Sequence, residues 1–292
     1  MKTLITILSL FFVVNSFAQE ENIKNHSHSR ALIPLKYYKQ KFKKPLTQKD
    51  SLNFVYRDND TLVVIENYKP KGIRVPYKYK DSTFLDAYTK VAFTYSNDSL
   101  KNKTVMKYWK DDVSIFFSKS IPKKTKKDFM VFANSLVNKI DSLNINVVKH
   151  VEDSNYIIYN SGDFEYESRM VNNKESEYYM YWNGKNQIYK TTIKIITSVN
   201  FNEKTKLIAM KKLFFQSLGN FTFNNELECI NYFSGCFNEN STVSNFDMEL
   251  LKYHYSYGIC KGTNYETFME QHKKAKDILK NKNVRIGFLH QD

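Results

Sequence analysis

The chain has 292 residues with a formal net charge of +14, and at this length burial of about 70 to 75% of the unfolded surface is expected. Proteins that recognise bases and phosphates usually do so with arginine guanidinium groups. Specific nucleic-acid binding is therefore disfavoured, because only five of the 44 basic residues are arginines: Arg30, Arg57, Arg74, Arg169 and Arg285. A solvated Lys-rich surface and adhesion to an anionic glycan or lipid surface both stay open.

Residues 1–18, MKTLITILSLFFVVNSFA, have the layout of a cleavable secretory signal. Lys2 supplies the positive start, an apolar run extends from Leu4 to Val14, and Ala18 precedes Gln19. The run is too short to span a bilayer, and no later segment approaches the roughly 18 apolar residues of a membrane helix. We therefore expect a secreted or periplasmic protein with no transmembrane segment after signal cleavage, whose envelope or extracellular partner the sequence does not identify.

The region after the signal, residues 19–105, is predicted to be a loosely ordered arm followed by a small β-rich extension. Residues 19–50 are polar and Lys-rich with little periodicity. LNFVY and TLVVIENY, separated by a turn from Arg57 to Asp60, predict a hairpin. The pattern of residues 84–108 does not distinguish helix from strand.

Residues 106–292 carry clearer signals and are predicted to form the main domain. VSIFFS at 113–118 has the composition of a buried strand, and a helix follows whose apolar residues recur at three- and four-residue steps from Phe129 to Leu143. Strands are next predicted at VVKHV and NYIIYN, which suggests a crossover unit. Asn183-Gly184, between EYYMYW and QIYKTTIKIIT, predicts a hairpin with a type I′ turn. The aromatic residues Tyr178, Tyr179, Tyr181 and Trp182 fit either strand packing or an exposed aromatic binding face, and we favour packing.

The segment KKLFFQSLGNF, residues 211–221, lies in a predicted amphipathic helix. Leu207, Met210, Phe214 and Leu218 share one face, and Gly219 is placed to end the helix in the left-handed conformation. Farther along, Ser244 with Asp247 and Thr263 with Glu266 have the spacing of capping boxes and predict two more helix starts.

The spacing of this helix invites comparison with zinc peptidases, in which two His one turn apart bind the metal and a Glu between them is the general base. Aligned on Gly219, the chain has Lys212 and Gln216 at the His positions, Leu213 at the Glu position and Thr222 at the third ligand. An ammonium repels Zn²⁺, an amide is a poor ligand, and Leu cannot take a proton. The helix is degenerate as a zinc site.

The order of motifs from Trp109 to about residue 260 resembles a family of secreted bacterial domains of unknown function that are related to zincin-fold peptidases. The resemblance rests on two short motifs, whose matching residues are Gln216, Leu218 and Gly219 in the first and Ser244, Asp247, Leu250, Leu251, Tyr255 and Gly258 in the second. It implies an α+β fold with a zincin-like mixed sheet and packed helices. Two glutamates of the family motif are replaced by Lys212 and Leu213, so any chemistry that depends on them is not expected here.

Other candidate sites carry weaker signals. The six His are scattered, no nucleotide-binding or nucleophile motif is present, and we expect neither a metal nor another cofactor. Exported chains favour disulfides, and Cys229 with Cys236 would close a short loop, although Cys260 competes as a partner for either.

These observations favour an exported binding or structural protein with a metalloprotease-like scaffold and no catalytic residues. The alternative is a secreted hydrolase whose active site the sequence spacing does not reveal. Adhesion to an anionic glycan or lipid is a third reading, and it predicts loss of binding at high ionic strength.

Overall fold

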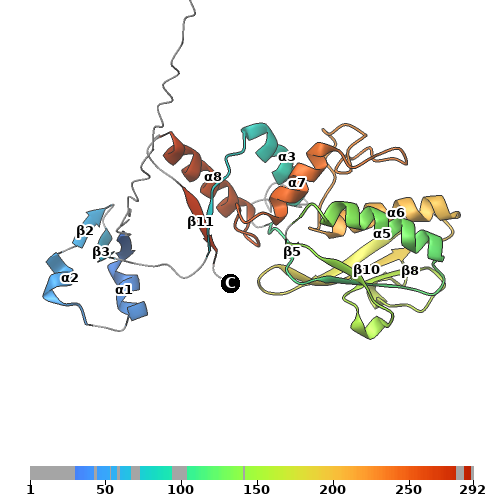
Figure 1. Cartoon of the computed structure of the whole chain (residues 1–292), viewed down its shortest axis with the longest axis horizontal. Helices are drawn as coiled ribbons and strands as arrows, with labels where there is room; N and C mark the ends of the chain where they lie inside the picture. The colour runs from blue at the N-terminus through green and yellow to red at the C-terminus, as the bar shows by residue number, and fades with distance from the viewer. Residues whose placement is uncertain are drawn as a thin grey trace, which may run out of the picture. The chain divides into compact units, whose positions relative to one another are not determined.

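The computed structural model describes residues 30–42, 45–52, 54–57, 60–66, 73–93, 104–140, 142–280 and 286–290. The predicted signal, residues 1–18, lies outside this set. The chain divides into two compact units, Met1–Lys71 and Gly72–Asp292. The protein is of the predicted α+β class (Figure 1). None of the described helices is long and apolar enough to cross a membrane.

The first unit contains a three-stranded antiparallel sheet in the order β1-β3-β2. The predicted hairpin is confirmed, since Phe54 pairs with Val63 and Arg57 with Asp60. The arm is more ordered than predicted, because residues 30–42 form a strand and a helix, and Ile33 and Val63 are buried. The elements of this unit are β1 (Arg30–Pro34), α1 (Leu35–Phe42), α2 (Gln48–Leu52), β2 (Phe54–Arg57) and β3 (Asp60–Glu66).

The second unit begins at Gly72, well before the predicted boundary at residue 106. The ambiguous region contains α3 (Ser82–Ala92), which starts where Asp81 Oδ1 accepts the N–H of Phe84 at 2.8 Å. The fully buried Tyr88 of α3 packs edge-to-face on Tyr253 at 4.8 Å. Local sequence patterns cannot show a contact between such distant segments, which explains why this region was ambiguous in the sequence. The unit also contains β4 (Ile73–Pro76), antiparallel to β11 (Gly287–His290).

The centre of the second unit is a six-stranded sheet with the path β5-β10-β8-β6-β7, and β9 pairs with β10. Among the described strands, all pairs of this sheet are parallel except β9 with β10, and β9 is an antiparallel strand with one described neighbour. The strand predicted at 147–151 ends at Val147, before a short 3-10 helix, Val151–Asp153. The strands are β5 (Tyr108–Trp109), β6 (Val113–Phe117), β7 (Ile145–Val147), β8 (Tyr156–Asn160), β9 (Glu177–Trp182) and β10 (Gln187–Ile195).

Helices α5 (Lys123–Val137) and α6 (Glu203–Ser217) lie side by side along the sheet (Figure 1). Between these helices and the sheet, the ring centroid of Phe214 lies 5.2 Å from that of Phe129 and 5.6 Å from that of Tyr156. α5 ends six residues before the predicted limit at Leu143, although that side chain is buried. The ring of Tyr166 packs against the rings of Phe116 in β6 and Tyr159 in β8.

Two further helices complete the unit, α7 (Asn245–Tyr255) and α8 (Tyr265–Leu279). The capping box of Ser244 and Asp247 is confirmed. The predicted box at Thr263 is wrong by one residue, because Asn264 is the N-cap of α8 and its side chain accepts the N–H of Thr267.

The hairpin between β9 and β10 is confirmed, but its predicted turn is wrong. Asn186, with φ of 60°, takes the left-handed conformation, and Gly184 does not. The Asn183 side chain accepts the backbone N–H groups of Lys185 and Gln187, which builds a longer loop than the type I′ turn. Because the Asn183 side chain binds backbone N–H groups within the loop, the turn does not need a glycine with positive φ at position 184.

Candidate functional site

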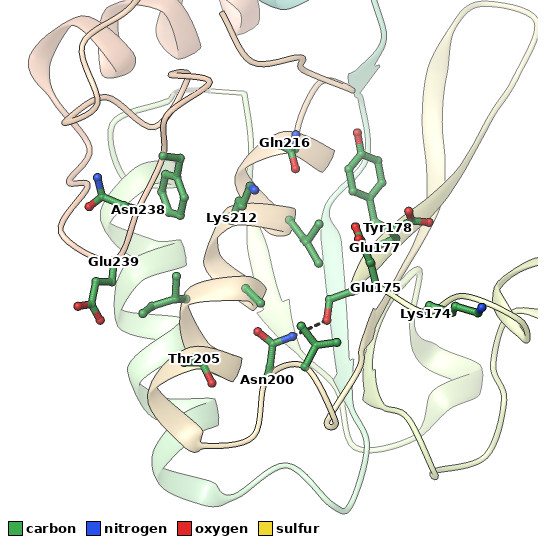
Figure 2. A pocket seen from close by; sticks show the side chains of 16 residues that line it. Lys174, Glu175, Glu177, Tyr178, Asn200, Thr205, Lys212, Gln216, Asn238 and Glu239 are labelled. Carbon is green, nitrogen blue, oxygen red and sulfur yellow. Dashed lines mark hydrogen bonds between the residues drawn. The ribbon is translucent and has the colours of Figure 1, made fainter. Parts of the chain in front are cut away.

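A groove of about 920 Å³ runs over α6 in the second unit. We call it the α6 groove. Figure 2 shows Lys212 and Gln216 on the helix, Tyr178 on one side and Asn238 and Glu239 on the other. Its lining residues are Lys174, Glu175, Ser176, Glu177, Tyr178, Val199, Asn200, Thr205, Ile208, Ala209, Lys212, Leu213, Gln216, Phe237, Asn238 and Glu239.

Helical spacing explains which α6 residues face the groove. α6 starts at a capping box in which the Asn202 side chain accepts the N–H of Thr205. Met210 and Phe214 are buried against the sheet, and residues four apart share a face. Lys212 and Gln216 are therefore neighbours on the side that the groove exposes. Both are half-buried.

Lys212 is a half-buried cation without a carboxylate partner. Among the described residues it forms neither an ion pair nor a hydrogen bond. Its ammonium instead lies 4.8 Å from the ring centroid of Phe223 and 5.7 Å from that of Phe237. Burial lowers the pKa of Lys212 from its ordinary value, and the charge of Glu175 opposes that shift. The groove thus holds a positive charge that protein groups only partly compensate.

The residues aligned with a zinc site are brought together only in part. Lys212, Leu213 and Gln216 all line the groove. Thr222 does not line it, because its hydroxyl donates to the backbone oxygen of Lys90 at 2.9 Å and its N–H donates to that of Val91. An ammonium, an aliphatic side chain and an amide cannot form a zinc site. The residues present do not fit the metal.

Gly219 ends α6 for a different reason from the one predicted. The residue in the left-handed conformation is Asn220, with φ of 55°. Gly219 is required by close approach, because a Cβ there would lie 2.8 Å from His254 Nε2 and closer still to the ring of Phe221. Asn220 also holds the groove wall, since its Oδ1 accepts the hydroxyl of Tyr178 at 3.2 Å.

The second motif supports the end of α6 and does not line the groove. The hydroxyl of Tyr255 donates to the carbonyl oxygen of Leu218. The buried Asp247 accepts the N–H groups of Tyr232 and Phe233, and burial raises its pKa while these bonds lower it.

The remaining motif positions have equally local roles. Ser244 accepts the N–H of Asp247 at 3.0 Å. Gly258 donates its N–H to Ser256 Oγ at 3.3 Å.

The predicted disulfide, Cys229 to Cys236, is present, and Cys260 is a free thiol. The disulfide closes the loop that immediately precedes Phe237, Asn238 and Glu239, which form one wall of the groove. Glu239 also forms an ion pair with Lys204 at 2.7 Å, which ties this wall to the first turn of α6.

The opposite wall is formed by the start of β9 and the residues before it. Tyr178 is partly buried, and burial raises its pKa. Tyr179 and Tyr181 lie on the other face of the strand. The guanidinium carbon of Arg169 lies 4.9 Å from the ring centroid of Tyr179 and 5.1 Å from that of Tyr181. The favoured packing of these tyrosines holds for Tyr178, whereas Trp182 is 47% exposed.

Sequence reasoning missed most of the groove walls. Glu175, Asn200 and Phe237 come from three loops that no motif links, and only the folded chain brings them to α6. The only sequence signal was that the disulfide loop follows α6 closely.

Within the described ranges, no three His, Cys, Asp or Glu side chains are grouped so that they could hold a metal ion. No model of a known protein family matches the chain, and no curated protein matches it significantly. The α6 groove is therefore interpreted from its own geometry.

Proposed function

We propose that this chain is an exported, non-catalytic binding protein, and that its α6 groove receives an extended polypeptide segment by strand addition to β9. The observation that carries the proposal is the position of the groove between a strand with one neighbour and a helix that presents Lys212 and Gln216.

The unpaired side of β9 supplies the backbone groups that strand addition needs. β9 pairs only with β10 in the described part of the sheet. An edge strand presents a row of N–H and C=O groups that can pair with an extended peptide. Lining residues on α6 run from Thr205 to Gln216, a rise of about 16 Å at 1.5 Å per residue. That length accommodates about five residues of extended chain.

The chemistry of the groove favours binding over hydrolysis. A peptidase of the resembled family needs a metal and a general base, and the aligned residues are Lys212, Leu213 and Gln216. The scaffold of such a family, retained with these replacements, would keep a peptide-sized groove without the reaction.

Export is supported by two independent features. The sequence predicts a cleavable signal at residues 1–18. Cys229 and Cys236 form a disulfide, which is typical of oxidising compartments.

The test uses the purified mature protein and a library of acetylated, amidated heptapeptides rich in Val and Thr. We expect binding that Ile208→Trp abolishes, because the indole fills the floor of the groove. The matched control is Val131→Trp, an exposed site on α5, which should bind as the wild type does. Binding that Ile208→Trp leaves intact would refute the proposed location.

A second arm tests the alternative of a secreted hydrolase. Quenched fluorescent peptides are incubated with the protein alone, with added Zn²⁺ and with a chelator. We expect no cleavage in any condition. Cleavage that Ile208→Trp removes would establish the hydrolase instead.

A further inference from the structure

The α6 groove contains one feature that strand addition alone does not use, a pair of unpartnered polar side chains on its floor. Lys212 and Gln216 are one helical turn apart, both are half-buried, and the structure gives neither side chain a hydrogen-bond or ion-pair partner among the described residues. An ammonium offers three donors and a primary amide two. Donors gathered on one face of a helix fit an acceptor with two oxygens.

We propose that the groove selects a segment carrying an acidic side chain, Asp or Glu, whose carboxylate binds between Lys212 Nζ and the amide of Gln216. This inference rests on the proposed function, because it names the chemical class of the polypeptide that the groove receives.

The charges around the groove favour a single negative charge. Glu175, Glu177 and Glu239 also line it, and they would repel a phosphate or another multiply charged anion. Glu239 is paired with Lys204 at 2.7 Å, and Glu177 accepts a hydrogen bond from Asn173 at 2.8 Å. Glu175 offsets part of the charge of Lys212, but no carboxylate of the described residues forms an ion pair with its ammonium. One carboxylate of a ligand in direct contact with the ammonium would complete the counter-charge.

The neighbours of Lys212 strengthen the interaction. The rings of Phe223 and Phe237 place apolar surface beside the ammonium. Charge-assisted hydrogen bonds gain strength where water is reduced. Burial has already removed part of the ammonium hydration in the unbound protein, so less of that cost remains when a ligand binds.

Strand geometry explains why the carboxylate belongs to a side chain. Side chains of an extended chain alternate between the two faces of the sheet. A segment added to β9 therefore directs every second residue toward α6. The acidic residue reaches Lys212 from one of these positions while the backbone continues along the edge, so the ligand does not need to end in the groove.

The probe is the same library of acetylated, amidated heptapeptides, with each position varied in turn. We expect the wild type to prefer Asp and Glu at one position, with an affinity about tenfold or more above that of the Asn and Gln peptides. Lys212→Met should remove the preference. Gln216→Glu should also remove the preference, because the new carboxylate would form an ion pair with Lys212 within the protein.

Lys211→Met is the matched control. Lys211 is the preceding residue of α6, is also half-buried, and lies over Phe132 at 5.3 Å, outside the residues that line the groove. It should keep the acidic preference. Thermal unfolding of all three variants verifies that each is folded.

The outcomes separate the inference from the function on which it rests. Binding without a preference for acidic residues, or a preference that persists in Lys212→Met, overturns the inference and leaves strand addition in place. A second set of the same heptapeptides with a free C-terminal carboxylate is measured beside the library, and binding that requires this free carboxylate also overturns the inference. Failure of every peptide to bind overturns both.

Discussion

Gly219 and His254 approach so closely that a Cβ on the glycine would lie 2.8 Å from Nε2 of the histidine. His254 is fully buried and held at both ring nitrogens, by the hydroxyl of Tyr88 at 3.1 Å and the backbone oxygen of Lys107 at 2.8 Å. The imidazole cannot retreat without breaking these bonds. The end of α6 therefore packs closely against α7 at Gly219.

Gly219→Ala should lower the free energy of unfolding by about 1 to 3 kcal/mol, the range for an overpacked core. Urea unfolding measures this. Gly184→Ala is the control, because no atom lies within 4 Å of a Cβ added there, and it should change stability by less than about 0.5 kcal/mol. Equal effects of the two substitutions would show that close contact with Phe221 and His254 is not the reason for the glycine.

Sequence patterns predicted the elements whose signals are local. The hairpin of β9 and β10, the helix that contains Phe214 and the capping box of Ser244 each depend on neighbours within a few residues. α3 was ambiguous because its core contacts, such as Tyr88 with Tyr253, come from a distant segment. Glycine was assigned to two left-handed positions that asparagines take instead, since both residue types tolerate that conformation.

The site was predictable only on α6. Lys212, Leu213 and Gln216 were identified together because they share one helix, whereas Thr222, farther along the chain, was misassigned. The walls depend on tertiary packing of loops that carry no motif. The sequence also could not show that Lys212 has no partner, because an acidic residue can approach from any part of the chain.

Acid should destabilise the protein between pH 6.5 and about 3. Burial lowers the pKa of His254 to about 3 and that of His272 to about 4. Because both lie below the unfolded value, the unfolded chain binds more protons in this range. The contribution of the two neutral histidines to the free energy of unfolding is fully present above pH 6.5 and is lost as the pH falls through this range.

His272→Gln should make this loss smaller by about 3 kcal/mol, since its pKa is lowered from 6.5 to about 4 and each unit of pKa shift corresponds to about 1.4 kcal/mol. Urea unfolding at a series of pH values measures the difference. His150→Gln, which alters a histidine with a 69% exposed side chain, should leave the profile unchanged. A profile of His272→Gln that parallels the wild type would contradict the assignment.

Loss of the disulfide should destabilise the protein and loosen one wall of the groove. Cys236→Ser removes the closure of the loop from Cys229, which the chain-entropy model values at about 2 to 3 kcal/mol. We expect a lower melting temperature and weaker peptide binding. Cys260→Ser, which removes the free thiol, serves as the control and should retain both properties. An unchanged melting temperature in reductant would contradict the prediction.

Lys212→Met should raise the free energy of unfolding by about 0.5 to 1 kcal/mol, while it removes the proposed ligand selectivity. Such a trade-off is common, because residues that bind a ligand are often kept at a cost in stability. The ammonium is half-buried without a counter-ion, and a thioether of similar length removes the desolvation cost while keeping contact with Phe223 and Phe237. Lys90→Met should show no such gain, because Lys90 pairs with Asp86 at 2.7 Å and also with Glu226. Thermal and urea unfolding compare the two variants. A loss of stability in Lys212→Met would mean that its contacts with the two rings outweigh its desolvation, and that Lys212 is held for structure and not for a ligand.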